Sequence, residues 1–412
     1  MQKYITLTFL LCFGSLVQAQ EIVSIGAGYS QETYYSLPNG SLTSQAYDDW
    51  DLAFQIEGFA ASIRVNAVKG MALYKVPALA QSDWANVDTA GMSAWTSVYD
   101  SDASWSLGAF NQGIEAGNDF DLGWGTYDPL THIVSGDSLF VLMLADGSAK
   151  KLKIDQLSSG VYTFTYANLD GSSETTRGLD KADFVGKAFG YYAFAQDSML
   201  DREPLNADWD LVFHRYITNL APGVYYGVSG VQTNAGLSVA KLQNIDLNTV
   251  SLADTSNGFS TNISTIGYDW KSFDFATGWS LEDSLTYFVK ARDGEIYQLT
   301  FTDFGGSANG DFTFTKSNLS TAIESDIDGL SHFQLYPNPC AERLNVVFEL
   351  EKATETQLFV RDLQGRTVHQ ISLGRLQGFQ QIQLQSLSLP AGIYSVELQI
   401  GNQRLAQKLI VR

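Results

Sequence analysis

The residues Asp-Trp-Asp-Leu-Ala-Phe at positions 49–54 recur as Asp-Trp-Asp-Leu-Val-Phe at positions 208–213. An aromatic pair precedes each copy, Tyr34-Tyr35 in the first and Tyr191-Tyr192 in the second. Further matches follow in the same order: 137–147 with 283–294, and 160–169 with 310–319. Because only two copies occur, the repetition predicts two similar domains in tandem and not a solenoid.

Alternation within each copy is typical of strands. Trp50, Leu52 and Phe54 should lie on one strand face, and Asp49 and Asp51 on the other. Apolar segments flank an Asp-Gly pair in each copy, which is typical of a hairpin: 140–144 and 151–154 around 146–147, and 287–290 and 296–301 around 293–294. No helical period of useful length occurs. The sequence therefore predicts an all-β fold with two tandem antiparallel β-sandwich-like domains.

The N-terminus has the features of a secretory signal peptide. Lys3 provides a positive charge, residues 5–17 form an apolar run too short to span a bilayer, and small residues follow. We expect a signal peptide at 1–19, with cleavage between Ala19 and Gln20. No later stretch is apolar enough to predict a transmembrane helix.

The C-terminus carries several short motifs in a fixed order. They are Tyr336-Pro337-Asn338-Pro339, an alternating segment at 344–348, a turn with Asp362 and Gly365, a strand with Gly392 and Tyr394, and a basic, aliphatic end at 408–412. This order resembles the C-terminal sorting domain of type IX secretion cargo in Bacteroidetes. The resemblance implies a small β-sandwich at 332–412 and the type IX machinery as partner. It also implies delivery through the periplasm to the cell surface or extracellular space.

These features give the expected organisation of the chain. The parts are a signal peptide at 1–19, repeat 1 at 20–170, repeat 2 at 171–320, an acidic linker at 321–331 and the sorting domain at 332–412.

Charge and cysteine content restrict the possible partners. The net charge of −20 argues against nucleic acid, which requires a basic surface. Cys12 lies in the expected signal peptide, so Cys340 is alone in the exported chain and cannot form an intramolecular disulfide.

The duplicated unit resembles the HmuY-like family. The second copy carries the resemblance in 209–213, Thr218-Asn219, 233–236, Trp270 and 310–314, whereas the first copy has Val65-Asn66 in place of Thr-Asn. The resemblance covers roughly residues 30–320. It implies an all-β fold, and haem as a possible ligand, because founding members are haem-scavenging surface proteins.

Haem iron needs axial ligands, usually His or Met, in an apolar slot. The candidates for cofactor binding are His132, His214 and Met143. His132 precedes an expected strand, and His214 should point outward beside Asp210. None of them falls in an alignable ligand motif of the family, and a methionine in a β-domain is more often core filling. We predict no metal site, and haem as possible but not required.

Catalytic patterns are weak. No Gly-x-Ser-x-Gly turn occurs, and two histidines before the linker provide few ligands for a zinc site. The pairs Asp49/Asp51 and Asp208/Asp210 could place two carboxylates beside a glycosidic bond. A structural role, such as bonding to a neighbouring turn, explains their recurrence better. We therefore expect no enzyme and no catalytic residues.

Three functional hypotheses follow. The first is a non-catalytic secreted or cell-surface binding protein with an unassigned ligand. The second is a haemophore-like protein. The third is a carbohydrate-binding, adhesive or glycan-active surface protein.

Overall fold

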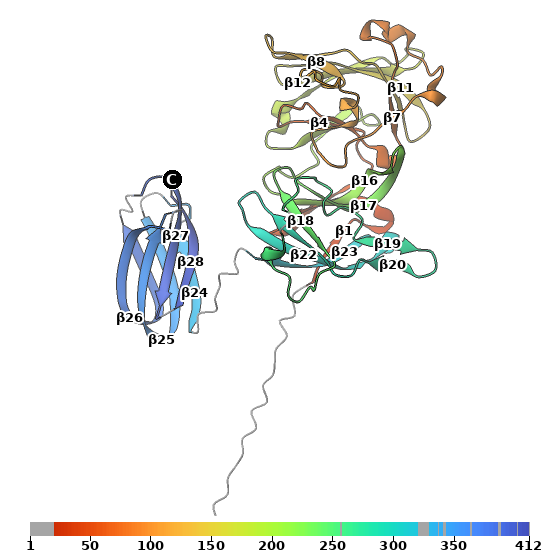
Figure 1. The fold of residues 1–412 in the computed structure, drawn as a ribbon. Coiled ribbons are helices and arrows are strands. Elements are labelled where there is room, and N and C mark those ends of the chain that lie inside the picture. Colours follow the sequence, from red (N-terminus) through yellow and green to blue (C-terminus); the bar gives the residue numbers. More distant parts are fainter. Residues whose placement is uncertain are drawn as a thin grey trace, which may run out of the picture. The chain divides into compact units, whose positions relative to one another are not determined.

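The computed structural model describes residues 20–255, 258–319, 329–336, 338–340, 343–362, 365–385, 389–401 and 403–411. The expected signal peptide at 1–19, with Ala19, and most of the expected linker lie outside the described residues. The chain forms two compact units, Met1–Ser317 and Asn318–Arg412, which are described separately (Figure 1). Strands dominate both units, which confirms the prediction of an all-β fold.

The first unit contains two β-sandwiches, named here module A and module B. Module A is built from β4–β15: β4 Leu52–Gln55, β5 Ile63–Val65, β6 Ala72–Lys75, β7 Ser97–Val98, β8 Gly125–Asp128, β9 Ile133–Gly136, β10 Phe140–Met143, β11 Ala149–Ser158, β12 Val161–Asn168, β13 Thr175–Asp180, β14 Phe189–Ala193 and β15 Ser198–Leu200. One sheet has the order β13-β12-β11-β10-β6-β7, with β9 paired to β11 and β8 paired to β9, and the other has the order β15-β14-β4-β5. Phe54 of β4 stacks on Phe164 of β12 in the core between them.

Module B is built from β1–β3 and β16–β23: β1 Gln20–Ser24, β2 Gln31–Ser36, β3 Gly40–Ala46, β16 Leu211–Ala221, β17 Val224–Thr233, β18 Ser238–Gln243, β19 Lys271–Asp274, β20 Gly278–Leu281, β21 Leu285–Lys290, β22 Ile296–Phe304 and β23 Asp311–Asn318, with the short helix α1 Gly306–Asn309. One sheet has the order β1-β23-β22-β21-β18, the other has the order β17-β16-β2-β3, and β19 pairs with β20. Phe213 of β16 stacks on Phe314 of β23 in the core.

The repeats of the sequence are not the units of packing. β1 pairs with β23 and β2 pairs with β16, so the first strands of repeat 1 complete the sheets of repeat 2. In the same way β13 pairs with β12 and β14 with β4, so repeat 2 completes repeat 1. Figure 1 shows β1 beside β23 in the lower lobe and β4 in the upper lobe. The expected boundary at 170/171 therefore does not separate two packed bodies.

Similarity between the repeats explains this exchange. The aromatic strands β2 and β14 have the same pattern, so either can fill the same place in a sheet. The chain leaves module B after Ala46 and enters module A at Leu52, and it returns between Leu200 and Leu211. Module A is consequently continuous in sequence. It is inserted between β3 and β16, the two sequence segments that together form module B.

The second unit is a smaller antiparallel structure. Its strands are β24 Leu330–Tyr336, β25 Arg343–Arg361, β26 Thr367–Gln385, β27 Gly392–Ile400 and β28 Gln403–Val411. The first half of β25 pairs with β24, the second half pairs with β27, and β26 follows both halves. Leu344, Leu358 and Val396 are fully buried in the apolar core. This arrangement agrees with the predicted small β-domain at the C-terminus.

Candidate functional site

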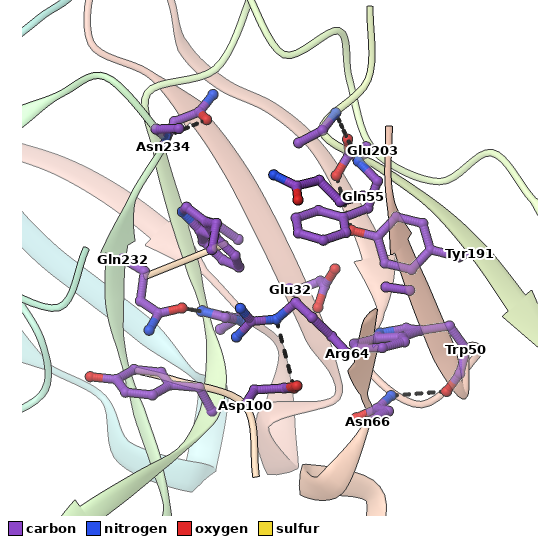
Figure 2. Close-up of a pocket in the computed structure, with 18 of the residues that line it drawn as sticks. Glu32, Trp50, Gln55, Arg64, Asn66, Asp100, Tyr191, Glu203, Gln232 and Asn234 are labelled. Carbon is purple, nitrogen blue, oxygen red and sulfur yellow. Dashed lines mark hydrogen bonds and ion pairs between the residues drawn. The ribbon is translucent and has the colours of Figure 1, made fainter. Parts of the chain in front are cut away.

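A cavity of about 370 Å³ lies between modules A and B. One wall comes from β4, β5 and β14 of module A, and the other from β2, β16 and β17 of module B (Figure 2). A volume in the range of roughly 300–1,000 Å³ is typical of pockets for small molecules. The cavity is therefore the leading candidate site in the described part of the chain.

The two copies of the Trp-Asp motif lie on opposite walls and make equivalent bonds. Asp51 accepts from the backbone N–H of Phe194 at 2.6 Å, and Asp210 accepts from that of Leu37 at 2.7 Å. Both aspartates thus bind the end of the strand that the other repeat supplies. These two bonds agree with the expected structural role for Asp51 and Asp210, the second aspartate of each copy.

The tryptophans of the motif do not lie where strand alternation places them. β4 and β16 begin only at Leu52 and Leu211, because the preceding aspartates turn inward to bind backbone N–H groups. Trp50 and Trp209 therefore pack on the side of the sheet that faces the cavity. The prediction that Trp50, Leu52 and Phe54 lie on one strand face is therefore wrong for Trp50.

Asparagine side chains fix the position of each tryptophan. Asn66 donates through Nδ2 to the carbonyl oxygen of Trp50 at 3.0 Å, as Figure 2 shows. Asn234 donates to the carbonyl oxygen of Trp209 at 2.9 Å. The repetition of this bond on both walls shows that the cavity has an approximate internal symmetry.

Aromatic rings form much of the lining. Trp50 packs edge-on against Tyr191 with ring centres 5.3 Å apart, and Trp209 packs in the same way against Tyr34 at 5.1 Å. Trp105 enters from a loop of module A and donates through Nε1 to the carbonyl oxygen of Thr233 in module B at 2.8 Å. The loop of Trp105 therefore links the two modules beside the cavity.

Acidic groups in the walls already have partners. Glu203 accepts from the N–H of Phe189 at 2.8 Å and from the hydroxyl of Tyr191 at 2.9 Å. Its burial raises its pKa to about 7, although these hydrogen bonds oppose the shift. Glu32 pairs with Arg202, which lies 2.9 Å from Asp49 as well. Burial acts to lower the pKa of Arg202, but the nearby carboxylates outweigh it and raise this pKa above its usual value.

Arg64 is the buried cation on the module A wall. Its guanidinium lies 3.7 Å from Asp100 and 4.8 Å from the ring centre of Trp105 (Figure 2). It also donates to the carbonyl oxygens of Ser101 and Ser104. Burial raises the pKa of Asp100, although Arg64 opposes the shift. The wall therefore holds this cation between an aromatic ring and a carboxylate.

His214 borders the cavity on β16. Gln232 donates through Nε2 to Ser264 at 2.9 Å, so its Oε1 faces the imidazole Nε2 at 3.0 Å and accepts from it. This assigns the proton of the neutral ring to Nε2. Burial lowers the pKa of His214 to about 3, and the charges of Arg64 and Arg202 act in the same direction.

Several polar atoms of the walls have no partner among the described residues. They include the indole nitrogens Nε1 of Trp50 and Trp209 and the amide oxygens Oδ1 of Asn66 and Asn206. Trp209 is 3% exposed and Asn66 1% exposed, so neither side chain reaches outside solvent. Unpaired buried donors and acceptors are costly, because each loses its bonds to water. The hydroxyl of Tyr216 is unpaired as well, and each of these atoms has almost no accessible surface, so they lie within the walls and do not face the open volume of the cavity.

The candidate ligands from the sequence are not brought together. His214 does not point into outside solvent as expected, because the face opposite Phe213 packs toward the other module. His132 lies in an exposed turn of module A and bonds through Nδ1 to the hydroxyl of Tyr127 at 2.7 Å. Met143 packs against an apolar cluster with Val141 on the far sheet. Only His214 of these three lines the cavity.

The two carboxylates of each expected pair bind different partners and do not act together. Asp49 pairs with Arg202, whereas Asp51 binds backbone and Lys69. Asp208 is exposed, and Asp210 binds Leu37.

Sequence reasoning did not identify the cavity or its asparagines. The repetition of an asparagine after each motif, at Asn66 and Asn234, was the available signal.

The sorting motif residues have defined places in the second unit. Asn338 bonds to the carbonyl oxygen of Lys408 and to the N–H of Ile410, so it ties the entry segment to β28. Gly365 has a φ of 76° in the turn that Asp362 closes. Gly392 begins β27, and Tyr394 donates to the carbonyl oxygen of Pro390 at 2.9 Å. Tyr336 ends β24, and Pro337 lies outside the described residues.

Comparison with known families identifies this unit. Residues 334–412 match the family described as the secretion system C-terminal sorting domain. The match confirms the predicted sorting domain and indicates export by the type IX route to the cell surface or extracellular space. No curated protein matches the chain. Among the described residues, no helix is long and apolar enough to cross a membrane.

Three solved structures match this chain at low sequence identity. Dimeric latent PorU from Porphyromonas gingivalis is 9% identical over 68% of this chain, with a TM-score of 0.20, and the chain spans 31% of PorU. A putative lipoprotein from Bacteroides fragilis is 15% identical over 38% of this chain and 88% of its own, with a TM-score of 0.18. A putative HmuY-like heme-binding protein from Bacteroides vulgatus is 15% identical over 38% and 91%, with a TM-score of 0.16. Scores this low do not establish a shared fold.

Proposed function

We propose that this chain is a non-catalytic binding protein, exported by the type IX route, which holds a small ligand in the cavity between modules A and B. The observation that carries the proposal is the cavity itself, about 370 Å³ in volume, which residues of both modules line. Its lining combines aromatic rings with a few fixed polar groups, which is typical of ligand sites.

The chemistry of the walls supports binding over catalysis. Glu203 and Asp100 accept hydrogen bonds from the backbone of their own module, and Asp102 accepts one from the hydroxyl of Thr218. A general acid or base must be able to reach the substrate proton that it transfers. Carboxylates whose oxygens already accept hydrogen bonds from the protein are poorly placed to exchange a proton with a substrate.

A search for a bound molecule tests the proposal. The full chain would be purified after secretion by a type IX host, denatured, and its released small molecules measured by mass spectrometry. We expect about one organic molecule per chain, and a much reduced amount in Trp209→Ala. The variant Trp279→Ala is the matched control, because Trp279 lies on β20 and does not line the cavity. Equal amounts in both variants, or none in the parent, would contradict the proposal.

A haem-binding function is the second candidate. The observation that favours it is a neutral histidine, His214, in an aromatic-lined cavity. Ligation through Nε2 would require the bond to Gln232 to break. A haemin titration of the full chain tests this candidate. We expect a sharpened, red-shifted Soret band that is lost in His214→Ala and kept in His132→Ala and Met143→Leu. A flat titration would exclude haem binding.

A further inference from the structure

The β19–β20 hairpin of module B carries an exposed aromatic surface, separate from the cavity. Among the described residues its two strands pair only with each other, and Figure 1 shows the hairpin standing out from the lower lobe. Phe273 is 51% exposed, and Phe275, in the turn, is 99% exposed. We propose that these two rings dock the protein, weakly and reversibly, on a lipid bilayer surface without net charge.

The two faces of the hairpin differ in polarity. Phe273 lies opposite Trp279 in the register, so both side chains share one face, with ring centres 5.1 Å apart. Phe275 packs edge-on against Phe273 at 5.5 Å. Ser272 and Ser280 form the next pair, on the other face, and their hydroxyls bond at 3.0 Å. This separation lets the hairpin lie in a bilayer interface as an amphipathic helix does, with its aromatic face toward the acyl chains.

The base of the hairpin is fixed to module B. Trp279 packs edge-on against Phe304 with ring centres 4.8 Å apart. Lys271 donates through Nζ to the carbonyl oxygen of Ser229 at 2.6 Å. The exposed rings at the other end are therefore held out on an ordered support, and little further ordering opposes their docking.

The outer end of the hairpin can enter an interface without taking a charge with it. Residues 275–281 include no charged side chain. Asp274 follows Phe273 on the strand, so its side chain lies on the hydroxyl face. Its carboxylate accepts from the N–H groups of Ala276 at 2.8 Å and Thr277 at 3.0 Å, which keeps it at the turn.

A second protein surface fits this hairpin less well than a bilayer does. A stable protein interface buries roughly 800 Å² on each partner. Two partly exposed phenylalanine rings supply only roughly 200–400 Å². Insertion into a bilayer interface needs no matching surface of that size, because the acyl chains adapt to the rings.

A sugar also fits less well. Its ring needs a flat aromatic face and polar groups beside that face for its hydroxyls. The planes of Phe273 and Phe275 are 82° apart, so they form no flat platform. The hydroxyls of Ser272 and Ser280 lie on the opposite face of the hairpin. Acyl chains require neither feature.

Charge decides which lipid surface is compatible. The chain has a net charge of −20, and Glu282 and Asp283 directly follow β20. Lys271 is the cation within the hairpin, but it is 6% exposed and cannot reach a headgroup phosphate. An anionic bilayer would therefore repel the protein, whereas zwitterionic headgroups would not.

Vesicle flotation of the full chain, purified after secretion, tests the proposal. A single myristoyl chain binds a bilayer with an association constant of about 10⁴ M⁻¹, and two rings should bind more weakly, so millimolar lipid is required. We expect binding to phosphatidylcholine vesicles and weaker binding to phosphatidylglycerol vesicles at low salt. Phe275→Ala should weaken the phosphatidylcholine binding about tenfold. Phe59→Ala is the matched control, because Phe59 is fully exposed in module A, away from this hairpin, and it should change nothing.

Each other outcome would overturn the proposal. No flotation of the parent chain, or equal losses in Phe275→Ala and Phe59→Ala, would show that the hairpin does not bind lipid. Stronger binding to phosphatidylglycerol would place the contact on a basic surface elsewhere. Sedimentation velocity without lipid detects self-association, and a dimer that Phe275→Ala dissociates would make a second copy the occupant. The exposure of Phe275 makes misfolding of its variant unexpected, and thermal unfolding checks this. None of these results bears on ligand binding in the cavity.

Discussion

The carboxylate of Asp51 accepts a hydrogen bond at 2.6 Å from the backbone N–H of Phe194, which lies 143 residues later in the chain. Asp210 makes the equivalent bond to Leu37, 173 residues earlier. Each aspartate therefore holds the aromatic strand that the other repeat supplies. The motif that reveals the duplication is also the contact that fastens the exchanged strands.

Replacing these aspartates should destabilise the protein. Asp51→Ala leaves the N–H of Phe194 without its acceptor and removes the ion pair with Lys69 at 2.5 Å. We expect the free energy of unfolding to fall by about 1–3 kcal/mol for Asp51→Ala or Asp210→Ala, as measured by urea denaturation. Asp208→Ala, at an exposed side chain, should change it by less than about 0.5 kcal/mol. Equal losses in all three variants would contradict this role.

Dissection of the chain should follow the modules and not the repeats. A fragment of residues 48–205 contains every strand of module A, from β4 to β15. A fragment of residues 20–170 lacks β13–β15 and carries β1–β3 without their partners in module B. We expect cooperative thermal unfolding for 48–205 and none for 20–170. A monomeric 20–170 fragment as stable as 48–205 would show that strand exchange is not needed for folding.

Local patterns predicted the hairpins well. Asp146-Gly147 and Asp293-Gly294 were expected to join strands, and the glycines have φ values of 83° and 91° between β10 and β11 and between β21 and β22. The exchange of strands could not be predicted in the same way. β2 and β14 share a Tyr-Tyr pair and are both mostly buried, so a pairing within a repeat and a pairing between repeats give the same pattern.

The cavity escaped prediction for a related reason. Alternation correctly placed His214 on the strand face opposite Phe213. Whether that face meets solvent or a second sheet depends on partners more than 150 residues away, such as Trp50 and Glu32, which no local period encodes. The sorting domain was predictable because its motifs are short, ordered and contained within one segment.

His214 should make stability depend on pH. Its pKa is lowered to about 3 in the folded chain, whereas an unfolded histidine titrates near 6.5. The contribution of neutral His214 to the free energy of unfolding is fully present above pH 6.5. It is lost as the pH falls toward 3, because the unfolded chain binds the proton first. Between pH 7 and 4.5 the parent should lose at least about 1 kcal/mol more than His214→Gln in urea denaturation. His132→Gln, at an exposed site, should behave like the parent. Superimposable pH profiles for parent and His214→Gln would reject this account.

Glu203 should change the stability of the folded chain in the opposite direction over the same pH range. Its pKa is raised to about 7 by burial, from a usual value of 4.5. The folded chain therefore keeps the proton longer than the unfolded chain, and stability falls as pH rises from 4.5 to 7. Glu203→Gln removes this titration, so its stability relative to the parent should rise by about 1–3 kcal/mol across that range. Urea denaturation at pH 4.5, 6 and 7.5 measures it. A constant difference at all three values would contradict the prediction.

The second unit should determine where the protein goes. Deleting 332–412 removes the segment that matches the sorting domain, so we expect the rest of the chain to accumulate in the periplasm of a type IX host. Asn338→Ala removes both side-chain bonds that tie the entry segment to β28, at 2.7 and 2.9 Å, and should reduce surface delivery without abolishing synthesis. Asp208→Ala, in the first unit, is the matched control for export. Fractionation and surface labelling measure the distribution. Normal surface appearance of the truncated chain would mean that modules A and B carry their own export signal.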